Sequence, residues 1–335
     1  MIRRRELILL LGGAAAAPSL LWPLAARGQP ATMRRIGALI GGAETDPESP
    51  GRTAAMREGL EQRGWSEGRN LRIDYRWAGA DPDRVRTLAA ELVATAPETI
   101  FAHTTPATAA LLDVTRSIPI VFASVSDPIG DGIVASFARP RGNVTGFTNV
   151  EASMGGKWLE ILKELAPGVT RVGFLFSPTL APGGGSYFLR PFEAAAPSFN
   201  VHPIAIPVED AAGVERALAS LAGGGSGGLI ANSDVFTTRH RADIIAAAAR
   251  HRVPAIYPFN YFASDGGLVA YGTDVKDLWR RAASYLDRIL RGEKPADLPV
   301  QAPTKFELVI NLNTAKTLGL EIPPTLLARA EEVIE

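Results

Sequence analysis

The chain has 335 residues, of which 46% are hydrophobic and 21% are charged, and its 35 basic residues balance 35 acidic ones. This balance offers no basic footprint for nucleic acid, and the absence of cysteine excludes disulfides, thiolate catalysis and cysteine metal sites. A chain of this length suits two domains or lobes better than one compact core.

The first 28 residues have the layout of a signal peptide. A basic start at residues 1–5 precedes an apolar stretch at 7–21, and residues 26–28 resemble a small-x-small cleavage site. A retained N-terminal anchor is the less favoured alternative because glycines and prolines interrupt the apolar stretch. The Arg4-Arg5 pair leaves a twin-arginine signal open, although no Ser or Thr precedes it. We expect residues 1–28 to be cleaved on export and the mature chain to stay in a bacterial periplasm.

Beyond this leader, short apolar runs alternate with helical patterns. In the first half the patterns predict strands at 36–40, 71–77, 99–102, 118–123 and 144–148, and helical segments at 52–63, 81–96, 107–116 and 129–137. Such alternation predicts an open, largely parallel sheet with helices on both faces.

After Val150 the same alternation restarts, which predicts a second α/β lobe. Its expected strands are 171–176, 201–206, 228–231 and 254–257, and its expected helices are 157–165, 188–199, 211–222 and 239–252.

The tail extends past two complete lobes, with strands expected at 267–271 and 306–310 and helices at 278–290, 314–318 and 324–333. We therefore expect the chain to cross back between the lobes. The predicted N-terminal lobe comprises residues 33–148 plus 272–302, and the C-terminal lobe comprises residues 149–271 plus 303–335. Three crossings would form a hinge.

Motifs of catalysis and cofactor binding are absent or misplaced. Residues 223–228 contain G-x-S-x-G, but the run follows a helix and precedes a strand, the reverse of a nucleophile elbow. Neither Gly41-Gly42-Ala43 nor the segment 155–158 has the spacing of a nucleotide loop. The histidines share no ligand spacing: His103, His202, His240 and His251. We expect no catalytic residue, no metal and no cofactor.

Polar residues that follow strands are the remaining candidates, because ligands of α/β sheets sit beyond the carboxyl ends of the strands. The organising stretch is 118–151, where an apolar strand runs into Ser126 and Asp127. The full candidate set for ligand binding is Thr104, Thr105, Ser126, Asp127, Asn149, Tyr187, Asn232, Ser233, Asp234 and Tyr257.

Each type of side chain in this set suits one part of a small ligand. Thr104 and Thr105, just before a helix, could take a carboxylate with their hydroxyls and free backbone N–H groups. Asp127 or Asp234 could hold an ammonium group, and the two tyrosines could stack on a ring or a flat apolar body. The alternative for the aspartates is structural, since both also fit helix N-caps.

Several segments together resemble ABC transporter substrate-binding proteins of the tryptophan/tyrosine type. They are IPIVFASVSDPIGDGIVASFARPRGNVTGFT at 118–148, GGKWLE at 155–160, YPF at 257–259 with GGL at 266–268, YG at 271–272, and 303–311. The resemblance covers essentially the whole mature chain. It implies a type I periplasmic binding fold, in which two Rossmann-like lobes joined by three crossovers close on a ligand. It also implies delivery of the ligand to a permease in the inner membrane.

The hypothesis we favour is a monomeric, exported solute receptor of an ABC importer, without catalysis. Its ligand is expected to be a small zwitterion or anion, with an amino acid, in particular an aromatic one, as first candidate. A sensory receptor of the same fold that presents its closed form to a signalling partner is the alternative. An α/β enzyme is a third possibility, for which the chain offers no placed nucleophile, metal cluster or cofactor loop.

Overall fold

The computed structural model describes residues 33–335, so the predicted signal peptide at residues 1–28 lies outside the described residues. In this part of the chain, none of the helices is both long and apolar enough to cross a membrane.

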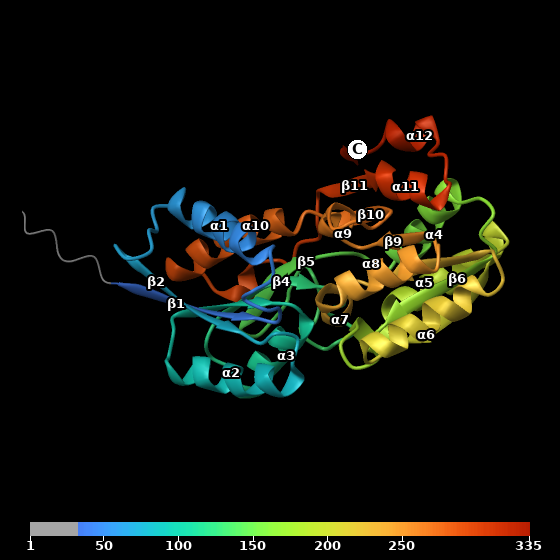
Figure 1. Ribbon diagram of the computed structural model, residues 1–335. Helices are drawn as coiled ribbons and strands as arrows, with labels where there is room; N and C mark the ends of the chain where they lie inside the picture. Colours follow the sequence, from blue (N-terminus) through green and yellow to red (C-terminus); the bar gives the residue numbers. More distant parts are fainter. Residues whose placement is uncertain (1–32) are drawn as a thin grey trace, which may run out of the picture. The chain divides into compact units, whose positions relative to one another are not determined.

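The first lobe is built on a five-stranded parallel sheet. Its strand order is β2-β1-β3-β4-β5, with β1 (Arg34–Ile40), β2 (Leu71–Trp77), β3 (Thr99–His103), β4 (Ile120–Val125) and β5 (Val144–Thr148). Alternate residues of β1 enter two different cores: Ile36 and Ala38 pack under one helical layer and Leu39 under the other. The first layer is α1 (Ser49–Glu61) with α10 (Val275–Leu290), and the second is α2 (Pro82–Ala94) with α3 (Thr105–Val114) (Figure 1).

Local chemistry explains why these helices begin where they do. The Asp81 carboxylate accepts hydrogen bonds from the backbone N–H groups of Asp83 and Arg84, and Pro82 occupies the first turn of α2. The helix then buries Val85 and Leu92 against the sheet.

The second lobe contains a seven-stranded sheet in the order β12-β11-β10-β9-β8-β6-β7. These strands are β6 (Arg171–Phe176), β7 (His202–Pro207), β8 (Gly227–Ala231), β9 (Ala255–Tyr257), β10 (Val269–Thr273), β11 (Phe306–Asn311) and β12 (Glu332–Ile334). They pair in parallel except for β10 with β11, which are antiparallel.

Helices also cover both faces of this second sheet. One face carries α4 (Met154–Leu165) and α5 (Ser186–Ala195), whose aromatic residues pack on Phe174, and the other carries α6 (Ala211–Ala222) and α8 (Arg241–Arg250). The shorter helices are α7 (Val235–Arg239), α9 (Asn260–Ser264), α11 (Leu312–Leu318) and α12 (Pro324–Leu327). The prediction of two α/β lobes is confirmed.

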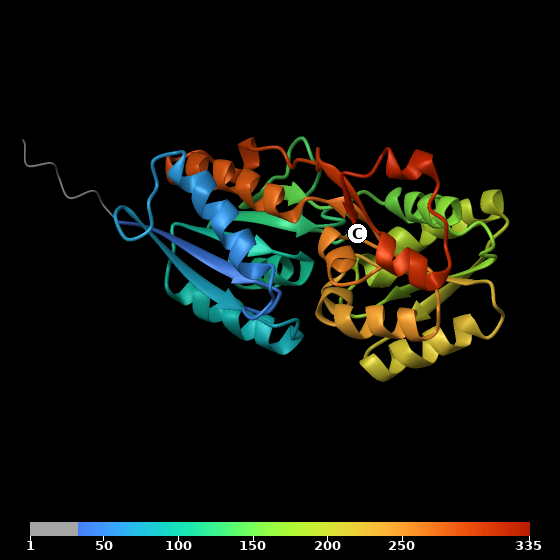
Figure 2. The same cartoon turned by 45° about the horizontal axis from the view of Figure 1, so that its top comes forward.

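The chain passes between the two sheets three times. It leaves the first sheet after β5, returns after β10 to place α10 beside α1, and leaves again beyond Gln301 to form β11 (Figure 2). A Cβ added at Gly59 of α1 would lie 2.8 Å from the Ala283 side chain of α10, so these two helices pack closely. Gln301 hydrogen-bonds through its backbone to Gly146 and Thr148 beside β5. Strand β10 extends to Thr273, two residues past the predicted lobe boundary, and the exact boundaries stay a prediction.

The helical piece expected at 129–137 is wrong, because the chain between β4 and β5 forms turns there. The Asp127 carboxylate accepts a hydrogen bond from the Gly130 N–H, and Gly132 has a positive φ of 69°, which ends any helical path. Of the apolar residues that suggested a helix, Ile133 is buried but Ile129 is 50% exposed.

Two other helices differ from expectation. The helix expected at 239–252 is found as α8, two residues shorter at each end, and it is preceded by the short helix α7, which was not expected. The helix expected at 324–333 ends at Leu327, and the chain then forms β12, because Glu331 donates its backbone N–H to Leu308 and so extends the sheet.

Candidate functional site

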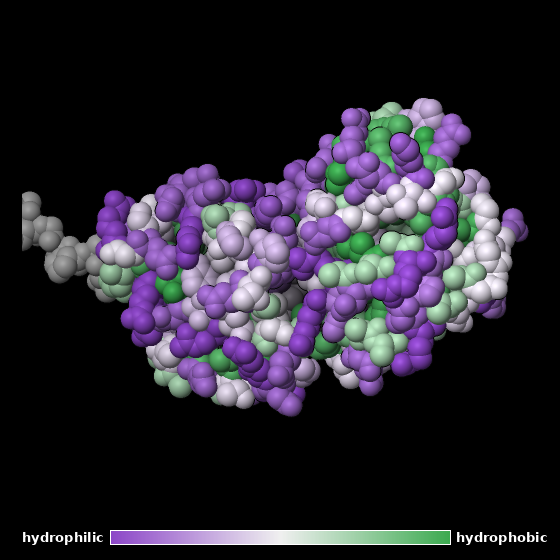
Figure 3. Space-filling model, viewed as in Figure 1, coloured by the Kyte–Doolittle hydropathy of each residue, from purple (hydrophilic) through white to green (hydrophobic). Residues whose placement is uncertain are grey.

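A cavity lies where the carboxyl ends of the strands of both sheets meet. Thr104, Ser124 and Ser126 line it from the first lobe, and Ser233 and Tyr261 line it from the second. It holds about 590 Å³ of space free of protein atoms, counting the open solvent at its mouth. Figure 3 shows hydrophilic and hydrophobic residues interspersed over this face, with a hollow between the two lobes.

The backbone is strained at two points of the first-lobe wall. Thr104 has φ 87° and ψ 158°, a combination that is nearly confined to glycine, and Ser124 has a φ of 62°. Thr104 is held in place because its N–H donates to the carbonyl of Ala123 in the neighbouring strand. Gly41 leaves room for the Thr104 side chain, since a Cβ at position 41 would lie 2.3 Å from Thr104 Oγ1.

Backbone N–H groups without an acceptor in their helix lie at the same wall. Helix α3 begins directly after Thr104, and its Thr108 N–H makes a first intrahelical bond to the Thr104 carbonyl. The backbone N–H groups of Thr105 and Ala107 precede that bond and have no acceptor within the helix. They carry the partial positive charge of a helix N-terminus, which suits a carboxylate.

Buried polar atoms without partners gather at this wall. Thr104 Oγ1, Ser124 Oγ, His103 Nδ1 and Arg52 Nε have no hydrogen-bond partner among residues 33–335. Buried polar groups are nearly always paired, so an unpaired cluster in a cavity indicates a place for a polar ligand group. Burial, with the nearby charge of Arg52, holds the pKa of His103 well below its usual range, so the imidazole is neutral.

On the second lobe the Asp234 carboxylate is already well satisfied. It accepts hydrogen bonds from the backbone N–H of Thr237 at 2.7 Å, the backbone N–H of Ser177 at 3.1 Å and the Asn232 side-chain amide at 3.2 Å. It is the N-cap of α7 in a capping box with Thr237, which confirms the structural alternative considered for this residue. Burial nevertheless raises its pKa.

A short hydrogen-bonded chain connects the lobes at the base of the cavity. Ser126 Oγ donates to Asn149 Oδ1 at 2.9 Å, and the Asn149 amide donates to Ser233 Oγ at 3.1 Å. All three side chains are buried, so these bonds fix the positions of the chain ends after β4, β5 and β8 relative to one another.

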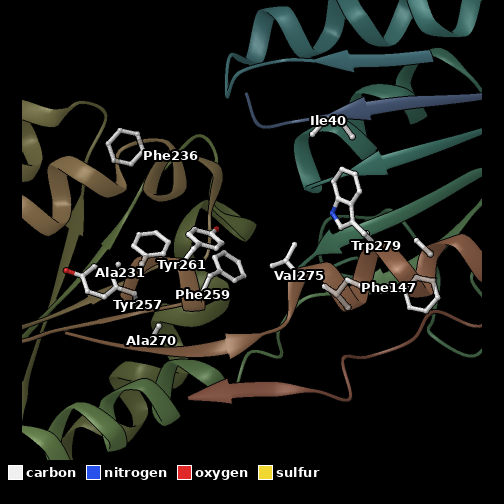
Figure 4. Close-up of a cluster of buried hydrophobic side chains, with 14 of the residues drawn as sticks. Ile40, Phe147, Ala231, Phe236, Tyr257, Phe259, Tyr261, Ala270, Val275 and Trp279 are labelled. Atoms are coloured by element: carbon white, nitrogen blue, oxygen red, sulfur yellow. The ribbon is translucent and has the colours of Figure 1, made fainter. Parts of the chain in front are cut away.

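Charged and aromatic groups form another side of the cavity. The Asp46 carboxylate accepts from Arg52 at 3.4 Å and pairs with Arg241 of the second lobe at 3.3 Å. The ring of Tyr261 is contacted by both guanidinium groups, with centroid distances of 5.2 Å to Arg52 and 5.4 Å to Arg241. In Figure 4, Phe259 and Tyr261 of one lobe face Val275 and Trp279 across the gap.

Six of the ten residues predicted from the sequence line this cavity: Thr104, Thr105, Ser126, Asn149, Ser233 and Asp234. Four do not line it: Asp127, Tyr187, Asn232 and Tyr257. Tyr257 is only 1% exposed and stacks on Phe262 within the core, on the side of Tyr261 away from the gap (Figure 4). Asn232 is fully buried and supports Asp234.

Asp127 and Tyr187 lie near each other outside the cavity lining. Burial, with the Asp127 carboxylate as the next contribution, raises the pKa of Tyr187 to about 12. The Asp127 carboxylate itself accepts from the Gly130 N–H, so it stabilises the turn after β4.

Sequence reasoning missed Asp46, Arg52, Arg241 and Tyr261. Asp46 had a usable signal, because it follows the first strand at the carboxyl edge of the sheet. Arg52 and Arg241 lie in the first turns of α1 and α8, where no motif distinguishes them from surface residues.

Two α/β lobes with a cavity at their strand ends define a two-lobed solute-binding protein. The sequence pattern of the family described as "ABC transporter substrate binding protein" matches residues 48–334, and the chain belongs to this family. Its members bind a small solute for an ABC transporter and are not enzymes. The predicted family and fold are thereby confirmed.

Individual relatives are distant. A protein named "Tyrosine-binding protein" from Clostridioides difficile (strain R20291) is 26% identical over 262 residues, which cover 78% of this chain and 74% of that protein. A crystal structure of an ABC domain in complex with L-Trp from Streptococcus pneumoniae has a TM-score of 0.83 and 24% identity, over 90% of this chain and 100% of the other. A conserved domain protein from Vibrio cholerae has a TM-score of 0.82 and 27% identity, over 90% and 99% of the two chains.

Proposed function

We propose that this protein is an exported receptor of an ABC importer that binds an amino acid, with an aromatic one as first candidate, and delivers it to a permease in the inner membrane. The observation that carries the proposal is the cluster of buried unpartnered polar atoms beside the N-terminus of α3. The family and the printed names of the tyrosine- and L-Trp-binding relatives support the ligand class.

The cavity has a complementary surface for each part of such a ligand. The carboxylate would meet the N–H groups of Thr105 and Ala107 and the Thr104 hydroxyl. Pro106, Leu180 and Val235 continue the lining into a small apolar recess, and with Phe259 and Tyr261 they offer an apolar body for a side chain. Asp46 and Asp234 are the carboxylates of the wall that an ammonium could approach.

The cellular setting belongs to the same proposal. The mature protein begins after residue 28, resides in the periplasm as a monomer and moves its lobes, divided as 33–148 plus 272–302 and 149–271 plus 303–335, about the three crossings. The crossings support a hinge because the segments that connect the sheets are few and are hydrogen-bonded to one another: Gln301 to Gly146 and Thr148, and Thr273 to the Asn149 carbonyl.

A thermal-shift screen of residues 29–335 tests the ligand class. The protein is unfolded, washed free of small molecules, refolded and then exposed to amino acids, small carboxylates and purines. A ligand at 100 times its dissociation constant adds about 2.7 kcal/mol to the free energy of unfolding, which is an easily measured shift. A shift with aromatic amino acids alone is the expected result. A shift with another class of compound would contradict an amino acid as the ligand but would be consistent with the receptor function. No shift with any of the compounds would overturn the proposed ligand class.

A further inference from the structure

Arg52 is a buried cation on the wall of the cavity. It lies in the first turns of α1 and is 5% exposed. Of the side chains that line the cavity within residues 33–335, it is the one that carries a full positive charge. A guanidinium removed from water needs a compensating charge and hydrogen bonds for its donors.

The protein supplies Arg52 with little of that compensation. A guanidinium has five N–H donors, and its one carboxylate contact among the described residues is the long 3.4 Å bond from Nη1 to Asp46 Oδ2. Asp46 is shared, since its Oδ1 also forms an ion pair with Arg241 at 3.3 Å and accepts a hydrogen bond from the Glu48 N–H at 3.1 Å.

Arg241 differs from Arg52 in having a second acid. Its Nε donates to Asp265 Oδ2 at 2.6 Å, within its own lobe. For Arg52 the corresponding Nε has no partner within the described part of the chain. The Asp46 carboxylate therefore compensates the charge of two guanidinium groups. Arg52 retains charge that is not compensated and N–H donors that are not used.

Apart from Asp46, the neighbours of Arg52 on this wall carry no negative charge that could neutralise it. They are the neutral His103 and the unpartnered hydroxyls of Thr104 and Ser124. Tyr261 packs against the guanidinium, with its ring centroid 5.2 Å from the Arg52 carbon, and so restricts the plane in which the donors point.

We propose that Arg52 is the charge partner of an anionic group of the ligand, so that the site selects carboxylates over their neutral esters and amides. The inference rests on the proposed receptor function and adds to it the group that recognises the charge. The Asp46–Arg241 pair positions Arg52, since it holds the carboxylate to which Arg52 is bound. A planar guanidinium can donate two parallel hydrogen bonds to one carboxylate, which a lysine cannot.

The experiment is a capture assay with a defined pool of small molecules extracted from bacterial cells. The refolded mature protein is incubated with the pool, separated by gel filtration and denatured, and the released compounds are identified by mass spectrometry. A second portion of the pool is methylated at its carboxyl groups. Wild type, Arg52→Gln, Arg52→Lys and the control Arg57→Gln are compared. Arg57 lies on the same helix but pairs with Glu67 outside the cavity.

Wild type and Arg57→Gln are expected to retain compounds that carry a carboxylate at pH 7, zwitterionic amino acids included, and to lose them when the pool is methylated. Arg52→Gln is expected to retain at least about tenfold less, because a charge-assisted hydrogen bond is lost. Arg52→Lys is expected to lie between the two. The comparison of the untreated pool with the methylated pool uses wild type alone. The charge requirement is therefore tested even if a variant fails to fold.

Two results overturn the inference alone. One is retention by wild type of a compound that has no carboxylate, or of a methylated one. The other is equal retention of a carboxylate compound by Arg52→Gln and Arg57→Gln. Retention of nothing by wild type overturns the proposed receptor function itself, and the inference with it.

Discussion

Asp46, in the loop after β1, and Arg241, in the first turn of α8, form an ion pair of 3.3 Å between the two lobes. Their side chains are only 9% and 13% exposed, so the pair is screened far less than a surface salt bridge. It lies beside the cavity, and its geometry exists only when the lobes are close together.

Loss of this pair is expected to loosen the closed arrangement of the lobes. Arg241→Gln removes the contact to Asp46, and we expect a larger radius of gyration in X-ray scattering and about tenfold weaker ligand binding, which is about 1.4 kcal/mol. Asp265→Asn is the matched control, because Asp265 pairs with Arg241 from the same lobe. Equal radii for wild type and Arg241→Gln would contradict a role for the pair in closure.

Neighbouring glycines after β1 provide a test of the first-lobe wall. A Cβ at Gly41 would lie 2.3 Å from Thr104 Oγ1, whereas a Cβ at Gly42 meets no atom within 4 Å. Gly41→Ala is expected to displace the Thr104 hydroxyl, to cost about 1–3 kcal/mol of stability and to weaken ligand binding. Gly42→Ala should leave both quantities nearly unchanged. Thermal unfolding with and without ligand measures both effects. Equal stability and equal ligand binding of the two variants would contradict a role of Thr104 in ligand binding.

Because the backbone of Thr104 is strained, its effects on stability and on ligand binding can be measured separately. Thr104→Gly relieves a conformation with φ 87° and ψ 158°, and we expect a gain of about 1 kcal/mol in the free energy of unfolding after the entropy cost of glycine. Thr104→Ala keeps the strain and should be close to neutral. Both variants lose the hydroxyl and should bind ligand more weakly. Denaturant titration measures the stability, and a destabilised Thr104→Gly would show that the strain is not stored at this residue.

His103 is expected to make the protein less stable in mild acid. Burial and the charge of Arg52 hold its pKa well below 6.5, the value for an unperturbed histidine. Below pH 6.5 the unfolded chain therefore binds a proton that the folded protein does not. Stability then falls as the pH drops, by up to about 1.4 kcal/mol per pH unit, and this contribution is absent above that pH.

Chemical denaturation from pH 7.5 to pH 5 measures the effect. His103→Gln should remove this part of the slope, whereas His202→Gln, at an exposed position on β7, should keep it. A slope that is the same in wild type and His103→Gln would mean that another group is responsible.

Much of the fold could be predicted because its signals are local. The alternation of apolar and charged residues at 71–77 and the apolar runs at 144–148 and 171–176 match strands β2, β5 and β6. The helix at 211–222 also matches, since the Asp210 side chain caps its first turn. In each case the residues that define the element lie within it or beside it in the chain.

Local signals misled where distant partners decide the structure. The apolar spacing at 129–137 resembles a helix, but the turn held by Asp127 and Gly130 prevents one. Residues 332–334 became strand β12 because β11 offers them a free edge, which no local pattern reveals.

The same division applies to the site. Thr104, Thr105 and Ser126 could be named from the sequence, because residues that follow parallel strands gather at one edge of the sheet. Tyr257 also ends a strand, but adjacent residues of a strand point to opposite faces, and its side chain entered the core.

The sequence by itself determined the two α/β lobes, the family and the polar strand ends, because each depends on neighbours in the chain. The tertiary structure alone brought Asp46, Arg52, Arg241 and Tyr261 together from the loop after β1 and helices α1, α8 and α9. Whether a charge is paired or left free depends on contacts between segments far apart in the sequence. For that reason only the folded protein could reveal a buried guanidinium with too few partners.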